Sequence, residues 1–187
     1  WEIVWTSGAT AALRLVADTF PFERGSVLLY QQSAHTSVVG MRGPAAAAGA
    51  ACLCARGGPG NLDDLMPAAA AALSRSAAVA NGGTVAHLCV VSGECNLTGE
   101  RAVASELAAA NSALGAIAGG SKWYMMLDGA KAASGDLRLV DTSASLCCVS
   151  LYKIFGEPCG LGALLIRRDV LPLLRKRPLG YFGGGSV

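Results

Sequence analysis

Residues 145–168 read SLCCVSLYKIFGEPCGLGALLIRR, and the rest of the chain is organised around this stretch. Two apolar runs, residues 146–151 and 161–166, have the composition of buried strands. Between them lie one lysine, Lys153, and a loop punctuated by glycines. Lysine is rarely fully buried, so this one either reaches solvent from a strand end or serves a chemical purpose. A desolvated lysine favours its neutral amine, which can form a Schiff base with an aldehyde.

Outward from this stretch, strand-like and helix-like segments alternate along the chain. Further strands are expected at residues 1–7, 25–30, 84–92 and 123–127, and in the run that ends at Ala55. Helices are expected at residues 11–17, 38–42, 62–74, 100–114 and 169–176. His87 falls inside one expected strand and is interpreted as a core histidine. The alternation predicts one α/β domain with a three-layer, mostly parallel sheet and helices on both faces.

The composition argues against several classes of protein. Charged residues make up 15% of the 187 residues, below the roughly 25% usual for globular domains, and the net charge is only +2. This charge is too small to suggest nucleic acid or an anionic membrane as the main partner. The basic residues Arg167, Arg168 and 175–177 are interpreted as a solvated helix and its flanks. The longest alanine-rich uncharged run, residues 44–55, has 12 residues, whereas a membrane span needs about 20.

The seven cysteines are odd in number and include no Cys-x-x-Cys pair. A disulfide framework or a zinc site would need more regular spacing, so neither is predicted and no metal ligand is assigned. Reduced thiols in a cytoplasmic protein are expected.

Polar residues follow the ends of several expected strands. They are residues 7–10, His35, Asn96, Asp128 and Lys153. Because the carboxyl ends of strands in a wound α/β sheet gather along one edge, these residues are expected to share one pocket. Each also has a plainer interpretation: residues 7–10, His35 and Asp128 could equally be helix caps.

Taken together, this set of side chains matches what pyridoxal 5′-phosphate (PLP) requires. A lysine binds the aldehyde, a carboxylate keeps the pyridine nitrogen protonated, and a helix N-terminus holds the phosphate. A planar side chain can cover the ring, and an amide can bind its phenolic oxygen. A nucleotide site fits less well, because neither Gly-x-Gly-x-x-Gly after the first strand nor Gly-x-x-x-x-Gly-Lys-Ser/Thr is present.

Four strings also carry a resemblance to a known family. They are SGATAAL (residues 7–13), HTSVVGMR (35–42), SLYKIFG (150–156) and YFGGG (181–185). They resemble the aminotransferase-like domain of the molybdenum cofactor sulfurase family, within the class V aminotransferase and cysteine desulfurase superfamily of fold type I. HTSVVGMR and YKIFG are the specific strings, and the resemblance runs along nearly the whole chain.

The resemblance implies roles for individual residues. Lys153 would be the Schiff-base lysine and, with His35, catalytic; His35 would also cover the ring. Asp128 would be the partner of the pyridine nitrogen, and Asn96 would bind the phenolic oxygen. Many desulfurases have glutamine at the position of Lys131, so a lysine there is a departure from the pattern.

The remaining implied residues concern the phosphate. Ala9, Thr10 and Ser150 would hold it, and Ser186 would reach the phosphate of the neighbouring protomer in a homodimer. Residues 1–187 would form part of a PLP-binding large domain. The N-terminal segment, the small domain and any molybdenum-cofactor-binding C-terminal domain would then lie outside them.

The activity implied is sulfur transfer. The enzyme would take sulfur from L-cysteine through a protein persulfide and pass it to the molybdenum cofactor of xanthine dehydrogenase and aldehyde oxidase types. The persulfide cysteine and the arginine that binds the substrate carboxylate would lie beyond Val187, so none of the seven cysteines is assigned that role. Two alternatives stay open: a general cysteine desulfurase for iron–sulfur assembly, and a non-catalytic fragment that retains the fold.

Overall fold

The computed structural model describes residues 1–76, 84–136, 138–157 and 159–174. Within these residues the strands form one sheet in the order β1-β7-β6-β5-β4-β2-β3. The strands are β1 (Glu2–Thr6), β2 (Val27–Gln31), β3 (Ala51–Ala55), β4 (Ala86–Ser92), β5 (Lys122–Asp128), β6 (Leu146–Ser150) and β7 (Gly162–Ile166).

One strand runs against all the others. β7 pairs antiparallel with both β6 and β1. The other pairs are parallel: β2 with β3, β2 with β4, β4 with β5, and β5 with β6. The six strands other than β7 therefore share one direction, and their carboxyl ends lie along the same edge. Strands β2 and β4 are buried along their whole length, as central parallel strands are.

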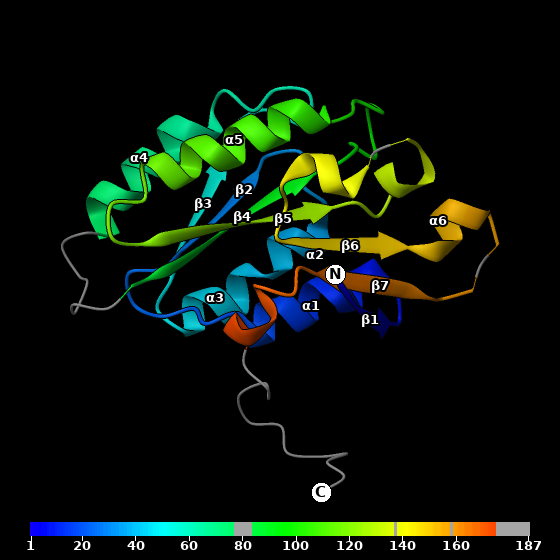
Figure 1. Cartoon of the computed structure of the whole chain (residues 1–187), viewed down its shortest axis with the longest axis horizontal. Coiled ribbons are helices and arrows are strands. Elements are labelled where there is room, and N and C mark those ends of the chain that lie inside the picture. Colours follow the sequence, from blue (N-terminus) through cyan, green and yellow to red (C-terminus); the bar gives the residue numbers. More distant parts are fainter. Residues whose placement is uncertain (77–83, 137, 158, 175–187) are drawn as a thin grey trace, which may run out of the picture.

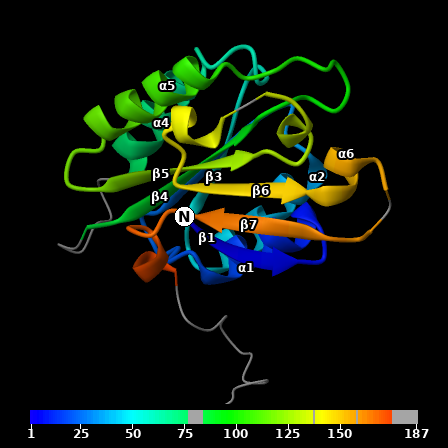
Figure 2. The same cartoon turned by 45° about the vertical axis from the view of Figure 1, so that its right-hand side comes forward.

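Helices cover both faces of this sheet (Figure 1). On one face lie α1 (Ala9–Thr19), α2 (Thr36–Gly40) and α3 (Arg42–Ala47), and on the other lie α4 (Leu65–Ser76) and α5 (Ala104–Ala116). The turned view shows the same three layers (Figure 2). Short 3-10 turns η2 (Ala132–Ser134) and η3 (Leu139–Thr142) connect β5 to β6. The prediction of a three-layer, mostly parallel α/β sheet is confirmed.

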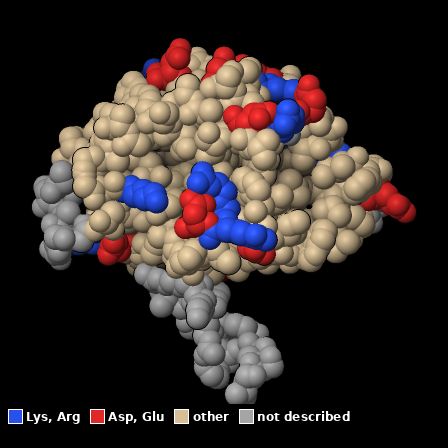
Figure 3. All heavy atoms as spheres, in the orientation of Figure 1, with Lys and Arg blue, Asp and Glu red and all other residues tan. Residues whose placement is uncertain are grey.

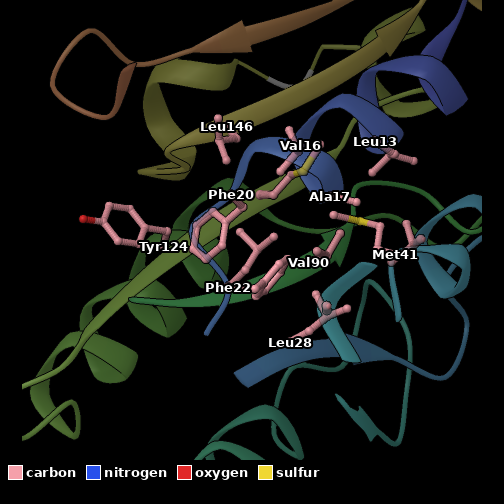
Figure 4. Close-up of a cluster of buried hydrophobic side chains, with 14 of the residues drawn as sticks. Leu13, Val16, Ala17, Phe20, Phe22, Leu28, Met41, Val90, Tyr124 and Leu146 are labelled. Carbon is pink, nitrogen blue, oxygen red and sulfur yellow. The ribbon is translucent and has the colours of Figure 1, made fainter. Parts of the chain in front are cut away.

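The layers are held together by two apolar clusters, one on each face of the sheet. In the cluster under α1, Leu13, Val16 and Leu146 are buried in the same core, and Phe20 lies against Phe22 and Tyr124 (Figure 4). Burying a side chain of this size contributes about 1.5–3 kcal/mol. This packing fixes α1, and with it the loop between β1 and α1.

Two expectations about local structure were wrong. The segment that contains Lys153 was expected to be a loop, but residues 151–155 form a short helix, α6 (Leu151–Phe155). Gly156 ends this helix with φ 74°. The helix expected at residues 169–176 is, within the described residues, only the 3-10 turn η4 (Leu171–Leu173). It contains Pro172, which has no N–H to donate to a longer helix.

Smaller differences concern helix boundaries. The helix expected at residues 38–42 is two short helices, α2 and α3, and α4 begins at Leu65 rather than at residue 62. In α5 the start moves from residue 100 to Ala104. None of these shifts changes which strand ends reach the common edge.

The exposed arginines near the end of β7 are paired with acids. Arg167 lies 2.7 Å from Asp169, and Arg168 lies 2.7 Å from Glu2 on β1. Figure 3 shows Lys and Arg side chains beside Asp and Glu side chains on one face of the molecule. Exposed pairs of this kind contribute at most about 1 kcal/mol each. Among the described residues, no helix is both long enough and apolar enough to cross a bilayer.

His87 is a core histidine, as predicted. It is 1% exposed, its Nδ1 accepts a hydrogen bond from the Val27 N–H at 3.1 Å, and its ring centroid lies 4.8 Å from that of Trp123. Burial lowers the pKa of His87 from its ordinary value of 6.5 to about 4, because the charged ring loses its hydration.

This histidine makes stability depend on pH. The unfolded chain binds the His87 proton below pH 6.5, whereas the folded chain binds it only near pH 4. The free energy of unfolding therefore falls as the pH is lowered through this window, by up to about 3 kcal/mol. We expect His87→Asn, which offers an oxygen to Val27, to show a flatter dependence. Urea unfolding at pH 7 and pH 4.5 measures how much the free energy of unfolding changes in wild type and in His87→Asn. An equal change in the two proteins would contradict the prediction.

Candidate active site

The loops at the common edge of the sheet surround a cavity of about 260 Å³. They follow β1, β2, β4, β5 and β6, whose carboxyl ends point the same way. Every predicted site residue that the structure describes lines this cavity: Ala9, Thr10, His35, Asn96, Asp128, Ser150 and Lys153. The remaining predicted residue, Ser186, lies outside the described residues. Segments from five parts of the chain are thus brought to one place, as expected for strand ends.

The first side of the cavity is the N-terminus of α1. Gly8 precedes the helix with φ 93° and ψ 170°, and no side chain caps the helix. Gly162 of β7 lies directly behind it, since a Cβ there would stand 2.6 Å from the Gly8 carbonyl carbon. Both positions therefore require glycine, one for its backbone angle and one for close approach. The uncapped N–H groups and the positive end of the helix dipole face the cavity, which suits an anion.

Lys153, on α6, lines the same cavity. Its side chain is half-buried, and Nζ donates a hydrogen bond of 3.1 Å to Oδ1 of Asn96, in the loop after β4. The amine is thus held at the cavity rather than simply extended into solvent. Its hydrogen-bond partner is a neutral amide. Among the described residues, no carboxylate lies within ion-pairing distance of this amine.

Asp128 ends β5 and is 8% exposed. Its Oδ1 accepts hydrogen bonds from the Ala130 N–H at 3.2 Å and from the Cys148 thiol at 3.4 Å. Burial, with the nearby charge of Asp128, raises the pKa of Cys148 well above its ordinary value, so this thiol keeps its proton and remains a donor. Two donors therefore fix one oxygen of a nearly buried carboxylate whose residue lines the cavity.

His35 combines both interpretations given to it from the sequence. Its Nδ1 accepts a hydrogen bond from the Ser37 N–H at 3.1 Å, so it does cap α2. The side chain is exposed and also lines the cavity. His35 can both cap α2 and line the cavity, because α2 begins in the loop that follows the carboxyl end of β2, at the edge of the sheet where the cavity lies.

Sequence reasoning missed several residues that line the cavity. Glu94 is one: its side chain is 7% exposed and binds Lys131 and Arg101, each at 2.9 Å. Its position in the loop after β4, two residues before Asn96, was the available signal. This pairing restrains Lys131, the other lysine that lines the cavity, and distinguishes it from Lys153.

Ser37 was also missed, although it stands inside the HTSVVGMR string. Its hydroxyl lies 2.9 Å from Nδ1 of His35 and 2.8 Å from Oγ1 of Thr10. Nothing in the local sequence places it against Thr10, which is 27 residues away.

These residues fit PLP. The uncapped start of α1 offers donors for a phosphate, the amine of Lys153 can bond to an aldehyde, and Asp128 can bind a protonated pyridine nitrogen. Asn96 and His35 line the space between these groups. The donor set therefore contains each group that this cofactor needs.

The sequence matches known enzymes along its whole length, although no family model matches it. Molybdenum cofactor sulfurase of Homo sapiens is 36% identical over 196 residues, covering 100% of this chain and 21% of that protein. The Arabidopsis thaliana protein of the same name is 34% identical over 207 residues, covering 100% of this chain and 25% of that protein. The chain thus spans about a fifth to a quarter of the length of these relatives.

Solved structures share the fold. Cysteine desulfurase from Thermococcus onnurineus superposes with a TM-score of 0.70 at 24% identity, over 100% of this chain and 42% of that one. The cysteine desulfurase CsdA of Escherichia coli superposes with a TM-score of 0.71 at 22% identity, over 98% of this chain and 42% of that one. A lysine-to-alanine variant of C-DES, with glycine covalently linked to its PLP, superposes with a TM-score of 0.70 at 20% identity, over 92% of this chain and 43% of that one. The chain is therefore homologous along its whole length to one segment of the molybdenum cofactor sulfurase family, and it has the fold of the cysteine desulfurases.

Proposed function

We propose that this chain is the PLP-binding part of a sulfurtransferase that takes sulfur from L-cysteine and passes it to the molybdenum cofactor. The observation that carries the proposal is the cavity that Lys153, Asp128 and the uncapped start of α1 line together. The names of the relatives at 34–36% identity support the acceptor, and C-DES supports the cofactor.

Each part of the cofactor would have its own holder. Nζ of Lys153 would bond to the aldehyde carbon, and the carboxylate of Asp128 would keep the pyridine nitrogen protonated. The N–H groups at the start of α1, with the hydroxyls of Thr10 and Ser150, would bind the phosphate. When bound, PLP supplies an electron sink for the pair of electrons left at the substrate Cα.

The protein would then move one proton. Nζ of Lys153 would be the base that takes the Cα proton of the substrate and the acid that returns it. The amide oxygen of Asn96, 3.1 Å from Nζ, would keep the amine near the cavity between these steps. The ring of His35 would cover one face of the cofactor and restrict the approach of water.

Transfer of the sulfur needs an attacking thiolate, and the buried thiols of Cys89 and Cys147 are poorly suited to supply one. Burial raises the pKa of Cys89 to about 12, and burial together with Asp128 raises that of Cys147 to about 12. At neutral pH both are therefore thiols rather than nucleophilic thiolates. This supports the expectation that the persulfide cysteine is none of these.

Some finer assignments rest on the resemblance alone. We propose a cytoplasmic homodimer in which Ser186 contacts the partner's phosphate, and residues 1–187 as part of one PLP-binding large domain. Analytical ultracentrifugation of the purified protein would test the dimer, and a sedimentation coefficient of a monomer at micromolar concentration would contradict it.

One second function has an observation in its favour. Two of the structural neighbours are cysteine desulfurases, so a general desulfurase for iron–sulfur assembly is the alternative acceptor assignment. The higher identity of the sulfurases, 34–36% against 20–24%, favours the molybdenum cofactor.

The function is tested in the intact protein supplied with PLP. We expect a visible absorbance band, release of alanine from L-cysteine, and restored activity of a sulfur-free xanthine dehydrogenase-type enzyme. Restoration of an iron–sulfur scaffold in its place would support the general desulfurase. Protein that stays colourless with PLP would contradict both and support the non-catalytic alternative.

A further inference from the structure

The hydroxyl of Ser37 joins two residues of the cavity that belong to different helices. It lies 2.9 Å from Nδ1 of His35 and 2.8 Å from Oγ1 of Thr10. Thr10 is in the first turn of α1, whereas Ser37 is in the first turn of α2. All three side chains line the cavity. The contact therefore connects the expected phosphate end of the site to the expected ring cover.

The positions of the available protons decide which atom donates in each contact between Thr10, Ser37 and His35. The backbone N–H of Ser37 can only donate, and it donates to Nδ1 of His35 at 3.1 Å. Nδ1 thus carries no proton, and the neutral ring has its proton on Nε2. Because Nδ1 has no proton, the Ser37 hydroxyl is the donor in its 2.9 Å contact with Nδ1, and its lone pairs can accept from Thr10.

The same contact restricts the side chain of Thr10. Threonine can place its hydroxyl in more than one χ1 rotamer in a helix. The 2.8 Å contact favours the rotamers that keep Oγ1 beside Ser37, and both residues line the cavity. Side chains that are ordered before a ligand arrives lose less entropy on binding it.

We propose that Ser37 is a positioning residue for the phosphate end of the site, acting through Thr10. The inference rests on the proposed function, because it assumes that the anion at α1 is the phosphate of PLP. Ser37 holds the Thr10 hydroxyl towards the cavity before the phosphate binds. When Thr10 donates its proton to a phosphate oxygen, the Ser37 hydroxyl can turn its proton from His35 Nδ1 to Thr10 Oγ1 and strengthen that bond, while Nδ1 keeps the hydrogen bond from the Ser37 N–H.

The test compares PLP with pyridoxal, which lacks the phosphate, in wild type and Ser37→Ala. Alanine keeps the backbone N–H that caps α2, so the fold and the His35 contact are retained. We expect Ser37→Ala to weaken PLP roughly 3- to 10-fold, which corresponds to one hydrogen bond, and to leave pyridoxal affinity unchanged. Ser37→Thr, which keeps the hydroxyl, is expected to restore PLP affinity. Absorbance titration of the purified protein measures all of these.

A double-mutant cycle with Thr10→Val shows whether Ser37 acts through Thr10. We expect the double variant to bind PLP no more weakly than Thr10→Val alone. Additive losses, or an equal loss of PLP and pyridoxal affinity in Ser37→Ala, would overturn the inference. Wild-type protein that binds neither compound would instead refute the proposed function, and this inference with it.

Discussion

Lys153→Ala is expected to remove the visible absorbance of the PLP-treated protein and to lower the release of alanine from L-cysteine by at least about 1,000-fold. The variant loses both the amine that bonds to the cofactor and the base that moves the substrate proton. No nearby group can replace it, because the other lysine of the cavity, Lys131, is paired with Glu94 at 2.9 Å. Absorbance spectra and alanine release, measured on the same preparation, test both losses.

Borohydride reduction provides the control for this prediction. Reduction should fix the cofactor to one peptide, and mass spectrometry should locate it on Lys153. Lys131→Ala is the matched variant, because it removes an amine that lines the same cavity. It should keep the reducible absorbance band. A cofactor adduct on Lys131, or a Lys153→Ala protein with an undiminished rate, would show that the site is assigned to the wrong amine.

Asp128→Asn is expected to separate cofactor binding from catalysis. Asparagine keeps an oxygen that can accept the Ala130 and Cys148 hydrogen bonds, so the fold around β5 should be preserved. The negative charge that favours a protonated pyridine nitrogen is lost, and with it the electron-withdrawing form of the ring. Removing one such electrostatic contact typically lowers the rate about 100- to 1,000-fold. Cofactor content by absorbance should change little while the rate of alanine release falls.

Asp136→Asn is the matched control for this charge change. Asp136 is fully exposed, and its carboxylate lies 3.9 Å from Arg101. A surface pair of this kind contributes little, so the variant should retain its activity within about twofold. Equal rates for wild type and Asp128→Asn would contradict the role of Asp128.

Much of the site could be predicted because it lies at strand ends. Asp128 directly follows an apolar run, and Asn96 and His35 lie a few residues beyond two others. A run of buried apolar residues predicts a strand locally, and parallel strands in one sheet bring their carboxyl ends together. Once the strands were recognised, a shared pocket followed without knowledge of any contact.

Other features could not be predicted from local patterns. Residues 152–155 were expected in a loop, and only the structure shows α6, which holds Lys153 towards Asn96. Glu94 was overlooked because its importance comes from Lys131 and Arg101, which bind it from positions 37 and 7 residues further along the chain. Ser37 has no local signal for its contact with Thr10.

Short apolar runs and the turn residues between them were sufficient to predict the strands that the structure describes, the α/β class and the residues that follow the strand ends. Tertiary structure alone decided that β7 runs against β6 and β1, and that Gly162 packs behind Gly8. It also decided that Ser37 connects α1 to α2. The reason is physical: strand direction, close backbone approach and side-chain partners depend on distant segments meeting, and local composition carries no record of which segments meet.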